Sequence, residues 1–384
     1  MKNRILILSA SIGAGHQKAG EALCRAYSER FGGVAEHVDF LHYASPRFSR
    51  LVERSYYLMT KHTPTVWKLL YQIEDNPKFA RYSPVKRLEV YIGLRKYREL
   101  IRKYQPDAII CTHFLPAAIV SYMYPEIPIP NGVVLTDYVS HPMWIHSDNH
   151  LFFVAHRGMR GELMMQGVEE SRIRVTGIPI NPNFSKIYDR RTLKEKLQLN
   201  PELPVILVMS GGHGIGPLQE VIRELCPMKD RFQVVVIMGH NRDAYRDIKE
   251  VFEETGLQGR VKGFTSNMHK WMAVSDLLIS KAGGLTVTEA MASGLPMIIV
   301  RPTPGQEDGN ANLLSNAEAA IHLKEISELG PTVASLFDEP DRLKAMGVNA
   351  KNLSKPGAAD DILNEINLLI EENAGMLSKT GLSS

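Results

Sequence analysis

The sequence is poor in cysteine, has little net charge and contains no long apolar run. Its 384 residues include three cysteines, at positions 24, 111 and 226, and none of them belongs to a CxxC pair. This number and spacing argue against a disulfide framework and are typical of a reducing compartment, so we expect a cytoplasmic protein. The net charge of +3 is too small to predict binding to nucleic acid. No apolar stretch approaches the roughly 18 residues that a membrane-spanning helix needs.

The sequence also lacks the complete form of two common nucleotide-binding motifs. The stretch GAGHQK, residues 13–18, follows a short apolar run and opens a helical pattern. A dinucleotide-binding loop needs glycine or alanine where this stretch has Lys18, although Asp39 resembles the acid that binds ribose in such proteins. No GK[ST] follows, so the loop is not a P-loop. The chain also has no Asp-x-Asp pair of the kind that holds a nucleotide-bound metal.

Short apolar runs alternate with helical patterns in two successive series. We expect ten strands, at residues 4–9, 34–39, 107–112, 132–136, 150–154, 204–209, 232–238, 260–264, 276–280 and 296–300. This alternation predicts an α/β protein with two doubly wound, Rossmann-like domains. A connector at 181–204 separates an N-terminal domain, 1–182, from a C-terminal domain, 190–355. We expect the last helix, 358–373, to pack back on the first domain.

One segment concentrates positive charge and aromatic residues. Residues 47–103 contain 14 basic and 5 acidic residues, and 14 minus 5 is +9. Basic residues interleaved with Trp and Tyr suit an anionic membrane surface. The alternative is a solvated helical face whose aromatic residues serve the core. On the membrane hypothesis, Trp67 anchors the interface and Arg81, Lys86 and Arg87 contact anionic lipid.

His16 lies in the first turn of the helix that follows the first glycine loop. Gly13 and Gly15 let a ligand approach the backbone, and the helix start offers free N–H groups. The positive end of the helix dipole disfavours imidazolium, so we expect a neutral His16 near pH 7. A neutral imidazole beside such a loop fits a general base for a hydroxyl acceptor. The alternative is that His16 only caps or packs.

A second cluster spans residues 280–312, with the sequence SKAGGLTVTEAMASGLPMIIVRPTPGQEDGNAN. Gly283 and Gly284 leave backbone N–H groups available at a helix start, and Thr286 adds a hydroxyl. This turn therefore suits a diphosphate without a metal. Glu289, one turn further along, has a carboxylate that suits the hydroxyls of a ribose. A polar loop then follows an apolar strand, and its residues suit sugar hydroxyls: Gln306, Glu307 and Asn310.

These motifs together resemble the diacylglycerol glycosyltransferases. The resemblance includes GAGH, TDY at 136–138, HPMWIH at 141–146, TGIPI at 176–180, MSGGHGIGP at 209–217 and VKGFTSNM at 261–268, in that order. It implies a GT-B glycosyltransferase fold, with two Rossmann-like domains facing across a cleft. It also implies a UDP-sugar donor, inversion at the anomeric carbon and no metal or other cofactor. More distantly, the C-terminal motif resembles the enzyme that adds N-acetylglucosamine to lipid II.

The resemblance also implies roles for individual residues. The residues implied to bind the donor are Gly212, His213, Gly263, Phe264, Gly284, Leu285, Thr286, Glu289, Gln306, Glu307 and Asn310. The acceptor side takes Gly13, Gly15, His141 and Trp144. Plant members carry an aspartate in the first loop where this chain has Ser11, so we expect His16 to be the base, with Asp137 as its rival or its orienting partner. A zinc site at Asp137, His141 and His146 is a further alternative.

The resulting prediction is transfer of a hexose, which we expect to be glucose, from a UDP-sugar to 1,2-diacylglycerol in an anionic membrane. The enzyme would act as a peripheral protein on the inner face of a bacterial membrane. No residue distinguishes a glucose from a galactose donor, and neither processivity nor the oligomeric state is readable. Three alternatives stay open: transfer to a polyprenyl-linked acceptor, a UDP-N-acetylglucosamine 2-epimerase on the same fold, and a regulator that binds nucleotide sugars.

Overall fold

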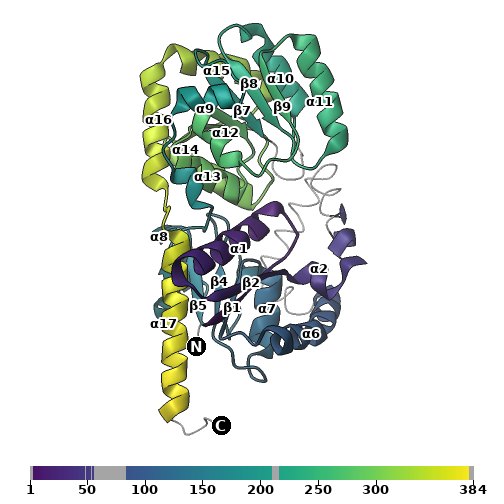
Figure 1. The fold of residues 1–384 in the computed structure, drawn as a ribbon, viewed down its shortest axis with the longest axis vertical. Helices are drawn as coiled ribbons and strands as arrows, with labels where there is room; N and C mark the ends of the chain where they lie inside the picture. Colours follow the sequence, from purple (N-terminus) through teal and green to yellow (C-terminus); the bar gives the residue numbers. More distant parts are fainter. Residues whose placement is uncertain (1–2, 48, 53, 56–83, 210–215, 380–384) are drawn as a thin grey trace. The chain divides into compact units, whose positions relative to one another are not determined.

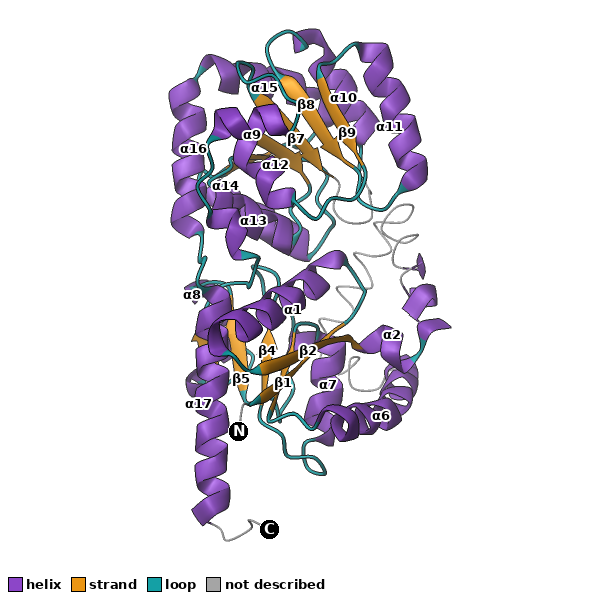
Figure 2. Ribbon diagram, viewed as in Figure 1, coloured by secondary structure: helices purple, strands orange, loops and turns teal. Residues whose placement is uncertain are grey.

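The structure, a computed structural model, describes residues 3–47, 49–52, 54–55, 84–209 and 216–379, with the backbone alone for 84–92, 242–244 and 376–379. The chain forms two compact units (Figure 1). Unit 1 comprises Met1–Ile180 and Lys355–Ser384, and unit 2 comprises Asn181–Ser354. Each unit is built around one parallel sheet, with helices beside the strands (Figure 2).

Unit 1 contains a six-stranded sheet in the order β2-β1-β3-β4-β5-β6, and every pair of neighbours is parallel. Its strands are β1 (Arg4–Ser9), β2 (Val34–Asp39), β3 (Ala108–Cys111), β4 (Asn131–Val134), β5 (Leu151–Val154) and β6 (Ile173–Val175). Its helices are α1 (Ala14–Ala26), α2 (Phe40–Ala44), α6 (Pro84–Tyr104), α7 (Phe114–Met123), α8 (Arg157–Met165) and α17 (Ala358–Lys379).

Unit 2 contains a second parallel six-stranded sheet, in the order β12-β11-β10-β7-β8-β9. Its strands are β7 (Val205–Met209), β8 (Gln233–Ile237), β9 (Gly259–Lys262), β10 (Leu277–Ser280), β11 (Met297–Ile299) and β12 (Ala320–His322). Its helices are α9 (Arg190–Lys196), α10 (Leu218–Leu225), α11 (Arg242–Thr255), α12 (Met268–Val274), α13 (Gly284–Ser293), α14 (Gln306–Asn316), α15 (Leu329–Asp338) and α16 (Pro340–Leu353).

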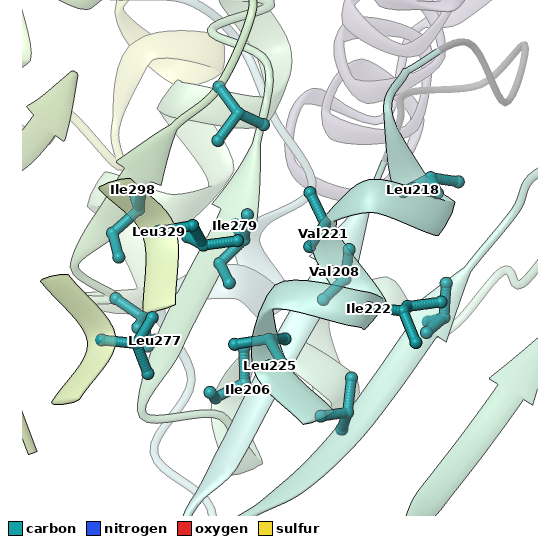
Figure 3. Packing of buried hydrophobic residues seen from close by; sticks show 14 of the residues in the cluster. Ile206, Val208, Leu218, Val221, Ile222, Leu225, Leu277, Ile279, Ile298 and Leu329 are labelled. Carbon is teal, nitrogen blue, oxygen red and sulfur yellow. The ribbon is translucent and has the colours of Figure 1, made fainter. Parts of the chain in front are cut away.

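The central strands are buried along their whole length, which explains why they are apolar throughout. All residues of β3, β4, β5, β7, β8 and β10 are buried. Parallel strands are covered by helices on both faces, and so they lack the alternation of a half-exposed sheet. Figure 3 shows this packing in unit 2, where Val221 and Leu225 of α10 lie against Ile206 and Val208 of β7. The alternation of apolar runs thus identified both sheets.

The sequence prediction missed two edge strands and several helices. Strands β6 and β12 pair on one side only, and each has a polar residue among its three (IRV and AIH), so neither forms an apolar run. The stretch expected to be a connector contains α9, and the pair α15 and α16 was not expected either. The helix expected at 358–373 is α17, whose residues Ile362, Leu363 and Ile366 lie in the core of unit 1.

Both sheets change direction next to their first strand. In unit 1 the neighbours of β1 are β2 and β3, and in unit 2 the neighbours of β7 are β8 and β10. Ligands of open α/β sheets bind beyond the carboxyl ends of the strands at such a point. The loops after β1 and β3, and those after β7 and β10, are therefore where each unit should bind its ligand.

Candidate functional site

His16 lies at this position in unit 1. Gly13, the N-cap of α1, has φ 92°, a value that side chains rarely tolerate, and this turn brings His16 into the first turn of the helix. The His16 Nδ1 atom lies 2.9 Å from the carbonyl oxygen of Thr112 and 2.8 Å from Oγ1 of Thr136. The Thr112 hydroxyl donates to the His16 carbonyl at 2.8 Å. Residues that follow two strands, β3 and β4, thus fix the imidazole.

These contacts determine which nitrogen of His16 can act as a base. A carbonyl oxygen only accepts hydrogen bonds, so Nδ1 carries the proton and donates it to Thr112. The Nε2 atom then has a free lone pair, and it makes no hydrogen bond within the described residues. Burial lowers the pKa of His16 from 6.5 to about 4, against the smaller opposing effect of the bond to Thr112. His16 is therefore neutral at physiological pH.

Two aromatic rings lie beside this imidazole. His113 is the N-cap of α7, and its ring centroid lies 4.6 Å from that of His16, with the two ring planes at 81°. Trp144 lies 6.0 Å from His16 and 6.3 Å from His113, measured between ring centroids. His113 is 1% exposed, and burial, together with the neighbouring His16, holds its pKa well below the usual value. Water is thus largely excluded from one side of His16.

The segment from Thr136 to Trp144 is braced by α8. His156 accepts from the N–H of Gly158 with Nδ1, so its Nε2 carries a proton and donates it to the Tyr138 carbonyl at 2.9 Å. Glu162 accepts from both the N–H and the hydroxyl of Ser140, at 2.9 and 2.8 Å. This rigid support fixes the segment that carries Asp137 and Trp144.

Of the residues expected on the acceptor side, Trp144 lies close to His16, whereas His141 contacts the backbone of its own segment. Trp144 is brought close to His16, as described above, and Asp137, partly buried, directly follows Thr136. His141 is 4% exposed, and its Nδ1 accepts from the N–H of Met143, which caps a short 3-10 helix, Pro142–Trp144. That capping bond gives His141 a structural role.

The carboxylate of Asp39, the acid that resembled a ribose-binding residue, accepts hydrogen bonds within unit 1. It caps α2 by accepting from the N–H of His42 at 3.1 Å. Its other oxygen accepts from the Gln17 amide at 2.8 Å. Among the side chains described, no group of three His, Cys, Asp or Glu residues is arranged as metal ligands would be, which includes the zinc set considered above.

In unit 2 the glycine turn lies between β10 and α13. Gly283, the N-cap of α13, has no side chain, so the helix start lacks the capping hydrogen bond that an N-cap side chain would supply. Thr286 and Glu289 are partly buried and three residues apart on α13, so they lie on one face of the helix. Gly284 and Leu285 are buried at the helix start. The turn has the form that binds anions.

Lys281 is linked to the loop that follows β11. Its Nζ atom lies 3.0 Å from Oγ1 of Thr303 and 3.5 Å from Oε1 of Glu307. The other oxygen of Glu307 accepts from the N–H of Thr303 at 2.5 Å. Gln306, at the start of α14, has a buried amide oxygen without a hydrogen-bond partner among the described residues. Glu307 is thus held by the Lys281 ammonium group and by the N–H of Thr303.

Asn310 is fully buried, and its amide donates to the Ala282 carbonyl at 2.9 Å. The amide connects α14 to the loop after β10. This bond gives the Asn310 side chain a structural connection within unit 2.

Phe264 and Gly263 follow β9. Phe264 is 53% exposed and stacks on His240, which follows β8, with centroids 4.2 Å apart and planes at 17°. An exposed flat face of this kind suits a nucleobase.

Five side chains were missed by the sequence analysis: Thr112, Thr136, His113, His240 and Lys281. Each comes one to three residues after a parallel strand, which is the signal that could have identified them. Four expected site residues lie outside the described residues: Trp67, Arg81, Gly212 and His213. The side chains of Lys86 and Arg87, on α6, also lie outside that description.

Two family profiles match the chain. The profile of the monogalactosyldiacylglycerol (MGDG) synthases matches residues 16–180, and that of the glycosyltransferase family 28 C-terminal domain matches residues 205–362. The processive diacylglycerol beta-glucosyltransferase of Bacillus subtilis (strain 168) is 30% identical over 392 residues, covering 98% of this chain and 97% of that protein. The chain belongs to the diacylglycerol glycosyltransferase family.

Solved structures agree with this assignment at the level of the fold. MurG of Acinetobacter baumannii matches with a TM-score of 0.62 at 14% identity, covering 95% of this chain and 99% of that one. The UDP-GlcNAc 2-epimerase from Neisseria meningitidis, bound to UDP-GlcNAc, matches with a TM-score of 0.60 at 13% identity, covering 95% and 99%. The fold is therefore GT-B, as predicted. Because a transferase and an epimerase share it, the family assignment rests on the sequence similarity.

Proposed function

We propose that this glycosyltransferase moves a hexose from a UDP-sugar to the free hydroxyl of 1,2-diacylglycerol, with inversion at the anomeric carbon. The observation that carries the proposal is the environment of His16, whose Nδ1 is held by Thr112 and whose Nε2 has a free lone pair. A neutral base of this kind suits a reaction in which a hydroxyl must lose its proton as it attacks. The similarity to the Bacillus protein over the full chain suggests diacylglycerol as the acceptor.

In the proposed mechanism, unit 2 holds the donor. The N–H groups at the start of α13 bind the diphosphate, Glu289 accepts from the ribose hydroxyls, and the stacked His240 and Phe264 offer a surface to the uracil. Gln306 has a buried amide oxygen that suits a sugar hydroxyl. The helix terminus supplies positive character to the leaving group, so the proposal needs no metal.

Unit 1 supplies the base. Nε2 of His16 takes the proton of the acceptor hydroxyl while the acceptor oxygen forms its bond to the anomeric carbon. The bond between that carbon and the diphosphate oxygen breaks on the opposite face, and UDP leaves with the bonding electrons. Asp137 remains the alternative base, because it directly follows the threonine that contacts His16.

The acceptor lies in a bilayer, so we propose that the protein binds the inner face of the cell membrane peripherally. The part of the chain that the structure describes contains no helix long and apolar enough to cross a membrane. The support for membrane binding is the excess of basic residues in segment 47–103.

The direct test incubates the full chain with diacylglycerol vesicles and radiolabelled UDP-glucose or UDP-galactose, followed by thin-layer chromatography of the lipids. We expect a labelled glycolipid with UDP-glucose, equally strong after treatment with EDTA. Analysis of the product by NMR should show the β-linkage that inversion of an α-linked donor gives. A ladder of slower spots would reveal processive addition.

Two results would change the proposal. A product with UDP-galactose alone would change the proposed hexose from glucose to galactose but keep the proposed reaction class. One matching family is named for monogalactosyl transfer and one relative for glucosyl transfer. No labelled lipid with either donor, from protein that still binds UDP, would reject diacylglycerol as the acceptor. A polyprenyl-linked acceptor would then be tested first, followed by epimerase activity on UDP-N-acetylglucosamine.

A further inference from the structure

Lys281 occupies a position that donor binding as described above does not yet use. It directly follows β10 and comes two residues before Gly283, the cap of α13. Its side chain is 19% exposed and that of Glu307 is 14% exposed, so their ion pair is largely withdrawn from water. A pair this far from solvent is screened less than a surface pair, and each charge depends on the other.

The ion pair lies against the glycine turn. A Cβ atom added to Gly283 would lie 3.8 Å from Oε1 of Glu307 and 3.9 Å from Oγ1 of Thr286. The same Glu307 oxygen lies 3.5 Å from Nζ of Lys281. The Glu307 carboxylate and the Thr286 hydroxyl therefore lie beside the residue that caps α13, and the Lys281 ammonium group lies next to that carboxylate.

The charges at this point favour an anion. The ammonium group and the start of α13 both carry positive charge, and the Glu307 carboxylate is the negative group that balances them. Glu307 is also fixed to the backbone of the next loop through Thr303. A diphosphate placed on the N–H groups of α13 would offer Lys281 a second, more highly charged partner. The plain alternative is that the pair only ties the loop after β10 to α14.

We propose that Lys281 is a donor-site residue that neutralises the diphosphate, and that Glu307 holds its ammonium group in place while the site is empty. The inference rests on the proposed function, because it assumes a nucleoside diphosphate at α13. When the bond to the sugar breaks, negative charge develops on the diphosphate oxygen, and an ammonium group already positioned there stabilises it. When Lys281 moves from Glu307 to the diphosphate, one oxygen of Glu307 becomes able to accept a hydrogen bond from a hydroxyl of the donor sugar.

The test compares the binding of UDP and uridine to the full chain by isothermal titration calorimetry. We expect Lys281→Met to weaken UDP binding by at least tenfold and to change uridine binding by less than twofold, because uridine has no phosphate. Lys281→Arg should retain most of the affinity for UDP. The matched control is Lys351→Met, which removes an ammonium group that donates to the Ala292 carbonyl at the other end of α13, and it should change neither affinity.

Glu307→Gln tests the second half of the proposal. The amide still offers an acceptor to the Thr303 N–H but carries no charge. We expect UDP affinity at least equal to that of the wild type, because Lys281 is no longer shared. In the Lys281→Met background an unpaired Glu307 would repel the diphosphate, so adding Glu307→Gln should recover part of the lost affinity.

The outcomes separate the inference from the function on which it rests. Wild-type protein that fails to bind UDP would overturn the proposed function and this inference together. Normal UDP binding by Lys281→Met would overturn the inference alone. An equal loss of UDP and uridine binding in that variant would also overturn it, because Lys281 would then act on the structure of the loop.

Discussion

His16 is oriented by two oxygen atoms that carry no charge. In a Ser-His-Asp triad a carboxylate fixes the imidazole and also stabilises its protonated form. Here the Thr112 carbonyl and the Thr136 hydroxyl fix the ring, and the low pKa follows from burial. In the proposed role as base, a histidine with this low pKa is weak, so we expect it to take the proton late, once bond formation has made the acceptor hydroxyl more acidic.

The pH dependence of the reaction should report this low pKa. A base must be unprotonated, and a pKa of about 4 keeps His16 neutral down to about pH 5. We expect the acid limb of kcat/KM near pH 4, instead of near 6.5, where an ordinary histidine titrates. The measurement is an initial-rate profile in detergent micelles, with circular dichroism recorded at each pH to confirm folding.

Two variants accompany the profile. His16→Ala should lower kcat by about 100-fold to 10,000-fold, the contribution typical of a general base, whereas His322→Ala, at an exposed position in unit 2, should not. An acid limb near 6.5 would contradict the burial of His16. Near-normal turnover by His16→Ala, with a severe loss in Asp137→Asn, would assign the base to Asp137.

At the scale of elements, buried and partly buried polar side chains connect the loops after strands with neighbouring helices. In unit 2 the Asn310 amide joins α14 to the loop after β10, and in unit 1 Glu162 joins α8 to the loop after β4. Buried groups of this kind are costly to leave unpaired, which keeps the loops in one conformation. The loop after β10 and the loop after β4 are each held against a neighbouring helix in this way.

Asn310→Ala should destabilise the protein by about 1–3 kcal/mol, the usual cost of leaving a buried carbonyl without its donor. Denaturant unfolding followed by circular dichroism measures this change. Asn349→Ala is the matched control, since its amide donates to the Glu318 carbonyl at an exposed position and should cost about 0.5 kcal/mol or less. Unchanged stability combined with weaker UDP-hexose binding would restore the direct sugar contact that the sequence suggested.

At the scale of the whole molecule, two units of the same architecture carry different chemistry. Unit 1 presents a neutral histidine beside aromatic side chains, and unit 2 presents the start of a helix and a paired lysine. The MGDG synthase profile matches residues of unit 1, and the profile of the glycosyltransferase family 28 C-terminal domain matches mostly residues of unit 2. The basic segment, with its net charge of +9, belongs to the chain of unit 1.

Membrane binding should depend on this segment and on salt. We expect the full chain to cosediment with vesicles that contain phosphatidylglycerol at low salt, and to do so far less with neutral phosphatidylcholine or at about 0.5 M salt. Lys86→Glu with Arg87→Glu should weaken binding about tenfold or more, because each cation near the surface contributes about 1 kcal/mol.

The control for this experiment changes the same charge elsewhere. Lys324→Glu with Lys344→Glu alters two exposed lysines of unit 2 and should leave vesicle binding within about twofold. Equal loss in both double variants would mean that net charge alone drives the association. No cosedimentation of the wild type at low salt would reject the membrane hypothesis.

The sequence by itself determined the two parallel sheets, the family and the position of His16 in a glycine turn. Apolar runs report burial on both faces, and glycine before a helix reports an open helix start; both are local signals that need no knowledge of distant contacts. It could not identify β6 and β12, in which a polar residue interrupts a run of only three.

Only the tertiary structure decided which atoms surround each site residue. Thr112 and Thr136 lie 96 and 120 positions from His16 in the chain, yet both contact Nδ1, and the Thr112 carbonyl assigns its proton. Glu307 similarly meets Lys281 because parallel strands end at one edge of the sheet. The physical reason is that a protonation state or an ion pair depends on distances of a few ångströms between groups that the sheet, and not the sequence order, brings together.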